Sequence, residues 1–406
     1  MIDELVAAHG SPLWLVDLDR VRERLREFRA TWEVEWPDVE VAYSYKTNRL
    51  PAILRTIAAE GAGHEVVCAA EYAVARDVVG ADGPAVIVSG PAKPAGLLER
   101  AAQDGALVIV DSAAEIERAA AAGVERVGVR VALPGVGVGA TRFGIRAREV
   151  PAAARTARAL GMSVEVVSGH VVSTGLRQPL GDGVHLAESV TVQWPPPPAR
   201  HARAAAILGA LAREVAVDCV DLGGGHPAGP PLALHAGAAA DALRAAGFAG
   251  RLLLEPGRAI VADAVDLALG VVAVKRLEDG TRCVLVDGGT NLLPGALWAW
   301  PRIEPATEVR GPRAATLVSG PLCLNVDVLS PDAPLPELRP GDLLVARDVG
   351  AYQQAQSTQF GDLRPAVVAR EAGRWRLVAR GESIDDISAG DLAASAAPGV
   401  WKESDS

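Results

Sequence analysis

The chain has 406 residues, half of them hydrophobic, and a formal net charge of −10 at pH 7. This composition is typical of a folded globular protein with more than one domain. The acidic balance argues against a nucleic-acid-binding protein, because binding to phosphates needs a basic face. Apolar runs are too short to span a membrane and no signal peptide is recognisable, so we expect a cytoplasmic protein without a membrane partner.

The four cysteines at positions 68, 219, 283 and 323 form no CxxC pair, which disfavours a zinc site. We therefore expect no bound metal. In the absence of a signal peptide, the cysteines are expected to be free thiols in a reducing compartment.

The start of the chain predicts a strand followed by a helix. Ser11–Asp17 is a short apolar run, and Leu18–Ala30 has helical periodicity. We expect the strand to join a β-rich domain formed mainly by the C-terminal part of the chain.

From Val39 to Ile260, short runs rich in Val and Ile alternate with stretches that suit amphipathic helices. We expect eight strands, at Val39–Tyr45, Glu65–Cys68, Ala85–Ser89, Ala106–Asp111, Val127–Ala132, Val164–Val167, Ala216–Leu222 and Arg251–Glu255. Helices are expected at Leu50–Glu60, Glu71–Val79, Ala113–Ala122, Ala152–Leu160, Ala202–Glu214 and Ala238–Ala246.

Eight strand–helix units of this length predict an α/β fold of the (β/α)8 barrel type. The alternative, an open doubly wound sheet, needs a glycine fingerprint after its first strand, and Tyr45-Lys46-Thr47 has none. We assign residues 31–268 to the barrel. Leu176–Arg200, rich in Gly and Pro, interrupts the alternation as a surface insertion, a loop over the barrel mouth, or a plain linker.

Past Val271 the pattern changes to that of a β-rich domain. Asp279-Gly280 and Ala372-Gly373 are turn signals between apolar runs, and helical periodicity is absent until Ser383–Ala394. We assign residues 1–30 and 269–406 to this second domain.

Polar residues at the carboxyl ends of barrel strands usually belong to the active site. Here these ends carry Lys46, His64, Glu65, Gly90–Lys93, Asp111, Arg130, His170, Gly223–Gly225 and Glu255–Arg258. Lys46 ends an apolar strand, and desolvation there would lower the pKa of its amine and favour imine chemistry. On its own it could equally be an ordinary snorkelling lysine.

The other strand ends supply groups for a phosphorylated aromatic ligand. Gly223–Gly225 can bring backbone N–H groups close to an anion, or can simply make a tight turn, and Arg258 suits a phosphate. Glu255 could pair with a ring nitrogen or with a barrel arginine such as Arg130. His170 could stack on a ring or be a satisfied core histidine. Together they indicate an aromatic, phosphorylated, imine-forming cofactor, and pyridoxal phosphate has all three properties.

These motifs resemble those of the fold-type III pyridoxal-phosphate decarboxylases, which include diaminopimelate and ornithine decarboxylases. The resemblance covers nearly the whole chain. It rests on Pro12–Asp17, Tyr43–Asn48, Gly61–Val67, Arg142–Ile145, Asp221–Pro227, Glu255–Arg258, Gly320–Cys323, Gly341–Asp342 and Gly350–Tyr352. It implies a barrel like that of alanine racemase with a C-terminal β-rich domain.

The resemblance also implies roles for individual residues. Lys46 would form the Schiff base, Glu255 would pair with the pyridinium nitrogen, and His170 would stack on the ring. The phosphate would be held by Gly223, Gly224, Gly225, Gly257, Arg258 and Tyr352. Cys323 would donate a proton across the interface of a homodimer with shared active sites.

Three positions depart from the family pattern. The second histidine after His170 is missing, so the phosphate hydroxyl could be Ser173 or Thr174. The residue after Cys323 is Leu324 instead of an acid, and the stretch Asn291–Trp298 lacks the arginine and tyrosine of diaminopimelate decarboxylases.

We place Leu324, Trp298 and Asp327 at the substrate site. A charged distal group would be unpaired there, so we expect the substrate to be neither diaminopimelate nor ornithine. A less polar, bulkier or carrier-tethered amino acid is expected instead, for example in secondary metabolite biosynthesis.

Two other functions are compatible with parts of the pattern. An amino-acid racemase of the same fold would carry an arginine at the ring nitrogen, which Glu255 argues against. A regulatory pseudoenzyme would have lost the cofactor-binding residues, and here these are present.

Overall fold

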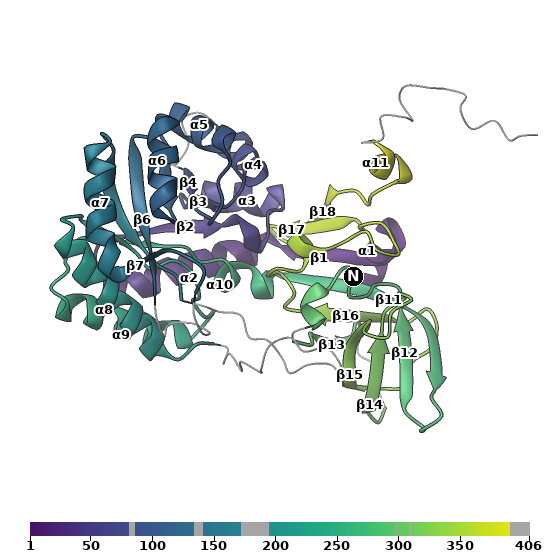
Figure 1. Cartoon of the computed structure of the whole chain (residues 1–406). Coiled ribbons are helices and arrows are strands. Elements are labelled where there is room, and N and C mark those ends of the chain that lie inside the picture. Colours follow the sequence, from purple (N-terminus) through teal and green to yellow (C-terminus); the bar gives the residue numbers. More distant parts are fainter. Residues whose placement is uncertain (81–85, 134–140, 172–194, 298, 308–310, 390–406) are drawn as a thin grey trace, which may run out of the picture.

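The computed structural model describes residues 1–80, 86–133, 141–171, 195–297, 299–307 and 311–389. Ser173, Thr174, Trp298 and most of the predicted insertion lie outside the described residues. The rest of the chain forms a helix-covered barrel beside a mixed β-sheet (Figure 1).

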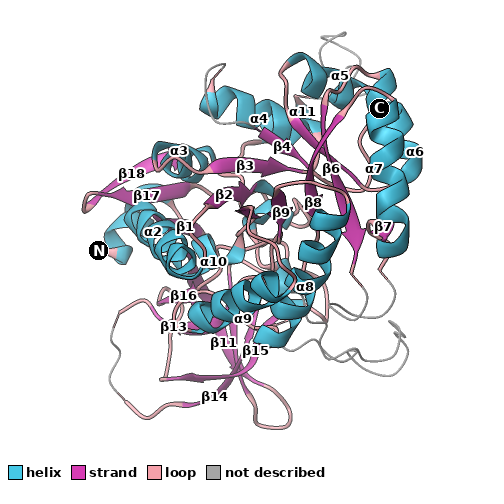
Figure 2. Ribbon diagram, turned by 90° about the vertical axis from the view of Figure 1, so that its left-hand side faces the viewer, coloured by secondary structure: helices cyan, strands magenta, loops and turns pink. Residues whose placement is uncertain are grey.

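Eight parallel strands close into a barrel, which confirms the (β/α)8 prediction and rules out the open sheet (Figure 2). β5 pairs with β6 and β10 pairs with β2, so the ring is complete. The strands are β2 (Val39–Ser44), β3 (Gly63–Val66), β4 (Val86–Val88), β5 (Leu107–Val110), β6 (Arg126–Ala132), β8 (Ser163–Ser168), β9 (Cys219–Asp221) and β10 (Arg251–Leu254), and the short β7 (Ile145–Arg146) pairs with the end of β6.

Helices follow the strands at nearly all of the expected places. They are α2 (Leu18–Glu35), α3 (Pro51–Ala59), α4 (Ala69–Val79), α5 (Ala95–Gln103), α6 (Ala113–Ala121), α7 (Val150–Ala159), α8 (Pro198–Glu214), α9 (Pro231–Ala245) and the short α10 (Arg258–Val261). Their buried apolar faces pack on the barrel, as the helical periodicity predicts. In the part of the chain that is described, no helix combines the length and apolarity needed to cross a bilayer.

The second sheet is built from both ends of the chain, as predicted. β1 (Leu13–Asp17) pairs antiparallel with β11 (Val265–Arg276) and parallel with β17 (Val367–Glu371). The remaining strands are β12 (Arg282–Val286), β13 (Arg302–Pro305), β14 (Ala314–Ser319), β15 (Val328–Leu335), β16 (Leu343–Arg347) and β18 (Arg374–Ala379), and the flanking helices are α1 (Ile2–His9) and α11 (Ile384–Ser388). The domain boundaries at residues 31 and 269 stay a prediction.

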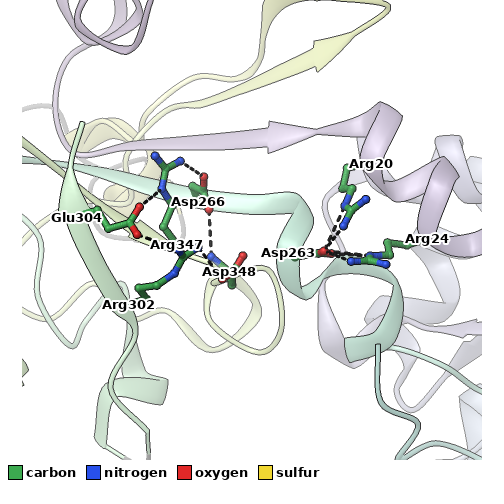
Figure 3. A network of polar contacts seen from close by, with 8 residues as sticks. All are labelled: Arg20, Arg24, Asp263, Asp266, Arg302, Glu304, Arg347 and Asp348. Carbon is green, nitrogen blue, oxygen red and sulfur yellow. Dashed lines mark hydrogen bonds and ion pairs between the residues drawn. The ribbon is translucent and has the colours of Figure 1, made fainter. Parts of the chain in front are cut away.

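Two aspartates clamp the connection between the barrel and the second sheet (Figure 3). Asp263, just before β11, accepts hydrogen bonds from Arg20 at 2.7 Å and from Arg24, both on α2. Asp266, within β11, accepts one from Arg347 of β16 at 2.7 Å. Because the pairs are only partly exposed, they are screened less than ordinary surface ion pairs. The Asp263 contacts tie the start of β11 to α2, and the Asp266–Arg347 pair links β11 to β16 within the second sheet.

Candidate active site

A cavity of about 380 Å³ opens at the carboxyl ends of the barrel strands. Most of the predicted cofactor residues line it: Lys46, His170, Gly224, Gly225, Glu255, Gly257, Arg258 and Tyr352. Glu65 and Arg130, which were expected at the strand ends without a role toward the cofactor, also line it, as do Ser44, Ser89 and Phe143. The structure therefore gathers one site from seven barrel strands and one loop of the β-rich domain.

Lys46 lies in a single 3-10 turn directly after β2 and contacts a buried acid. Its Nζ donates a hydrogen bond of 2.9 Å to Oε2 of Glu65, which is fully buried and also accepts from Ser44 Oγ at 2.5 Å. Burial lowers the pKa of Lys46, but the charges of Glu65 and Glu255 outweigh it, so the pKa is raised. The sequence predicted a lowered pKa for Lys46, and this prediction was wrong. It considered burial alone, whereas the two carboxylates that raise the pKa come from other strands of the barrel.

Glu255 is a buried acid with a histidine beside it. Its carboxylate oxygens find no hydrogen-bond donor of ordinary geometry among the described residues, although His170 Nε2 lies 3.3 Å from Oε2. Burial, together with Asp221 and Glu65, raises the pKa of Glu255 well above its usual value. The alternative pairing of Glu255 with Arg130 is not observed, since Arg130 pairs with Asp111 at 3.1 Å.

His170 connects this acid to the glycine loop. The N–H of Gly224 donates to His170 Nδ1 at 3.2 Å, which places the ring proton on Nε2, toward Glu255. Burial and then the nearby cations Arg130 and Lys46 lower the pKa of His170. The ring is therefore neutral at pH 7.

The glycine loop has a packing reason for each of its three glycines. Gly223 and Gly225 have positive φ values of 61° and 93°, and added Cβ atoms would lie 2.5 Å from His170 and 2.4 Å from Val171. A Cβ on Gly224 would lie 3.2 Å from the carbonyl oxygen of Glu255. The N–H groups of Gly223 and Gly224 already donate within the chain, to Asp221 and His170. The tight-turn interpretation thus accounts for much of the motif.

Tyr352 brings the β-rich domain into the site. Its N–H donates to the carbonyl oxygen of Thr47 at 2.8 Å, and its ring lies 5.3 Å from the Arg258 guanidinium. Its φ of 65° is unusual for a side chain of this size, and such strain is typical of functional sites. Gly257 is needed because a Cβ there would lie 1.9 Å from Thr47 Oγ1.

The loop between β14 and β15 lies apart from this cavity. Cys323 is exposed and Leu324 is 43% exposed. Asp327 is buried, and its carboxylate accepts hydrogen bonds from Thr290 N, Thr290 Oγ1 and Leu322 N at 2.7, 3.0 and 2.8 Å. None of the three is among the described residues that line the cavity.

The chain is similar to pyridoxal-dependent decarboxylases over most of its length. The family described as "Pyridoxal-dependent decarboxylase, pyridoxal binding domain" matches residues 18–194. Diaminopimelate decarboxylase of Deinococcus radiodurans is 30% identical over 94% of this chain and 96% of its own length. That of Actinosynnema pretiosum subsp. auranticum is 33% identical over 95% of this chain and 89% of its own length.

The solved structure of Helicobacter pylori diaminopimelate decarboxylase complexed with L-lysine aligns with a TM-score of 0.80 at 24% identity, covering 96% of this chain and 98% of that one. This likeness shows the fold, a barrel with a β-rich partner domain, and the relatives at 30% and 33% identity show that the chain is a fold-type III pyridoxal-phosphate enzyme. Among these, the chain belongs to the pyridoxal-dependent decarboxylase family, so it is a pyridoxal-phosphate-dependent carboxy-lyase.

Proposed function

We propose that the cavity binds pyridoxal phosphate with Lys46 as its covalent attachment point and decarboxylates an amino acid other than diaminopimelate or ornithine. The observation that carries the cofactor placement is Glu255, a buried carboxylate without an ordinary donor, facing the same cavity as the Lys46 amine. A protonated ring nitrogen is the donor that Glu255 lacks.

The other residues would hold the cofactor around this pair. His170 would lie against the ring, and Arg258, Gly225 and Tyr352 would hold the phosphate. Gly223, Gly224 and Gly257 would shape the surrounding backbone. Ser173 or Thr174 would supply a hydroxyl. When bound, pyridoxal phosphate supplies an electron sink for the carbanion that decarboxylation leaves.

Residues of the chain would accept, hold and return the protons that this reaction moves. Glu65 Oε2, 2.9 Å from Lys46 Nζ, is placed to accept the proton that Lys46 must lose before its amine can act as a nucleophile. Glu255 would keep the ring nitrogen charged and so stabilise the negative charge that develops in the transition state. Cys323 of a second copy would return a proton to the substrate carbon.

The substrate proposal rests on the side chain after Cys323. Leu324 cannot pair with a distal ammonium, and leaving that charge unpaired in an enclosed site would cost several kcal/mol. We propose that Leu324 and Trp298 accept a less polar, bulkier or carrier-tethered amino acid, as in secondary metabolite biosynthesis. Asp327, whose buried carboxylate accepts from Thr290 and Leu322, would act on the substrate only by holding this loop.

Release of carbon dioxide from a panel of amino acids tests this function. The panel contains meso-diaminopimelate, L-ornithine, amino acids with apolar side chains, and aminoacyl groups on a carrier protein. We expect the first two to react at least about tenfold more slowly, in kcat/KM, than the best member, since an unpaired charge costs more than 1.4 kcal/mol. Diaminopimelate as the best substrate would contradict the proposal.

We also propose that the protein is a homodimer with shared sites. Cys323 does not line the cavity of its own chain, and near it Leu324 and Val326 are exposed by 43% and 44%. Exposed apolar side chains of this kind mark interaction surfaces.

Mixing two inactive variants tests the shared site. Lys46→Ala and Cys323→Ala have their defects at different halves of each site, so a heterodimer contains one intact site. We expect an equimolar mixture, after subunit exchange, to recover roughly a quarter of the wild-type turnover. No recovery in a mixture shown by mass spectrometry to contain heterodimers would refute the shared site.

A further inference from the structure

A buried ion pair lies behind one wall of the cavity. Lys93 and Glu115 are 1% and 0% exposed, and Lys93 Nζ lies 3.0 Å from Glu115 Oε2. Lys93 Nζ also donates to the carbonyl oxygens of Gly90 and Ile109, both at 2.7 Å. All three ammonium protons therefore have acceptors inside the protein.

The pair holds the ends of two neighbouring strands. Gly90 follows β4, and Ile109 lies near the end of β5, so one ammonium group ties the two together. Glu115 Oε2 extends the connection by accepting from the N–H of Asp111 at 2.8 Å. The pair thus fixes the backbone at the mouth of the barrel.

Asp111 connects the ion pair to residues at the cavity surface. Its carboxylate pairs with Arg130 at 3.1 Å and accepts from the N–H of Gly144 at 3.1 Å. The guanidinium of Arg130 in turn lies 4.6 Å from the centre of the Phe143 ring. Arg130 and Phe143 line the cavity together with three residues at the end of β4, Ser89, Gly90 and Pro91.

This wall lies on a different arc of the barrel from the proposed cofactor residues. The strand order runs β5-β4-β3-β2-β10-β9-β8-β6, with β5 closing on β6. The cofactor residues follow β2, β8, β9 and β10, whereas the wall comes from β4 and β6 and is held by Asp111 after β5. The wall also has an unused polar group, because Ser89 Oγ is buried without a hydrogen-bond partner among the described residues.

Stability alone is a poor reason for such a pair. Replacing a buried ion pair with apolar side chains of similar volume is often neutral or stabilising. The contacts of the Lys93–Glu115 pair are instead with the backbone that shapes the cavity. Burial lowers the pKa of Lys93, although the neighbouring carboxylate of Glu115 acts in the opposite direction.

We infer that Lys93 and Glu115 are positioning residues. They hold the cavity wall formed by Ser89–Pro91, Arg130 and Phe143 in the position that lets the substrate's carboxylate end approach the cofactor. This inference rests on the proposed cofactor placement, which leaves the wall to face the substrate. The two residues act through the wall and touch no reacting atom.

Aminooxyacetate is the probe, because its oxyamine reacts with the cofactor's aldehyde carbon and its carboxylate mimics that of an amino acid. The test compares the loaded wild type with Lys93→Met/Glu115→Leu, which keeps the volume but removes the contacts to Gly90, Ile109 and Asp111. Glu115→Gln is the conservative variant, since its amide oxygen can still accept from Asp111 N–H. Ile116→Ala, also on α6 and fully buried, is the control for lost stability.

The double variant leaves Gly90 O, Ile109 O and Asp111 N–H without these partners, so its melting temperature is expected to fall, by no more than that of Ile116→Ala. Its dissociation constant for pyridoxal phosphate should stay within about twofold, while the rate constant for aminooxyacetate falls about tenfold to a hundredfold, because small misplacements have effects of this size. Glu115→Gln should stay within about threefold of wild type. Methoxyamine, which lacks the carboxylate, should react with all variants at similar rates.

An unchanged aminooxyacetate rate in the double variant would overturn the inference, as would an equal loss in Ile116→Ala. A loss of affinity for pyridoxal phosphate in the double variant would also overturn the inference, since the wall would then bind the cofactor and not guide the substrate. If the double variant does not fold, the rate constants of Glu115→Gln and Glu115→Ala for aminooxyacetate are compared in its place. Failure of the cofactor placement itself would show separately, as retained lysine-bound absorbance in Lys46→Ala.

Discussion

Replacing Lys46 with alanine is expected to abolish turnover and the absorbance of the lysine-bound cofactor. Lys46 is the only lysine among the described residues that line the cavity, whereas Lys93 is buried behind the wall with every proton in a hydrogen bond. Losing the covalent attachment and the amine's proton transfer should lower kcat by about 10³-fold or more. Absorbance spectra before and after borohydride, with carbon dioxide release, measure both effects.

The Lys46→Ala variant also leaves the buried Glu65 without its cation, which will destabilise the fold. Lys46→Arg separates the two effects, because arginine keeps the charge beside Glu65 but is not a nucleophile. We expect Lys46→Arg to melt near the wild-type temperature and still lack activity. Lys275→Ala, at an exposed position on β11, is the matched control and should change neither property. Activity or lysine-bound absorbance in Lys46→Ala would refute the assignment.

The strand ends were predictable because a closed parallel barrel brings all of its carboxyl ends to one face. Short apolar runs, mostly of Val and Ile, were enough to locate the strands, and residues that follow seven of them, from Lys46 to Arg258, line one cavity. Helix α5 was not among the predicted helices, although Leu97, Leu98 and Ala101 give it a buried apolar face.

Contacts between distant residues could not be predicted in the same way. The pKa of Lys46 depends on Glu65 and Glu255, which approach it only after β2 pairs with β3 and β10. Motif spacing likewise did not reveal that the glycines of the loop are required by packing against His170 and Val171. The roles proposed for Cys323 and Leu324 depend on a second copy of the chain, so neither the sequence nor one folded chain can test them.

Replacing Glu255 with glutamine is expected to lower kcat while stabilising the cofactor-free protein. A neutral amide cannot keep the ring nitrogen charged, and the loss of one such electrostatic contact lowers kcat by about 10²- to 10³-fold. The same change removes a carboxylate whose pKa is raised by burial and then by the neighbouring Asp221 and Glu65. Activity and structural stability should therefore change in opposite directions.

The pH dependence of this stabilisation has a definite sign. The pKa of Glu255 is higher in the folded protein than its unfolded value of about 4.3, so its contribution to stability is complete below that pH and is lost as the pH rises through the folded pKa. Asp221, with a pKa of about 6, adds a loss of the same sign in both proteins. Melting temperatures of the cofactor-free proteins should therefore converge near pH 4 and diverge toward pH 8, with Glu255→Gln the more stable. Equal melting temperatures at pH 8, or an unchanged kcat in the loaded variant, would show that Glu255 is not the buried charge on which the cofactor placement depends.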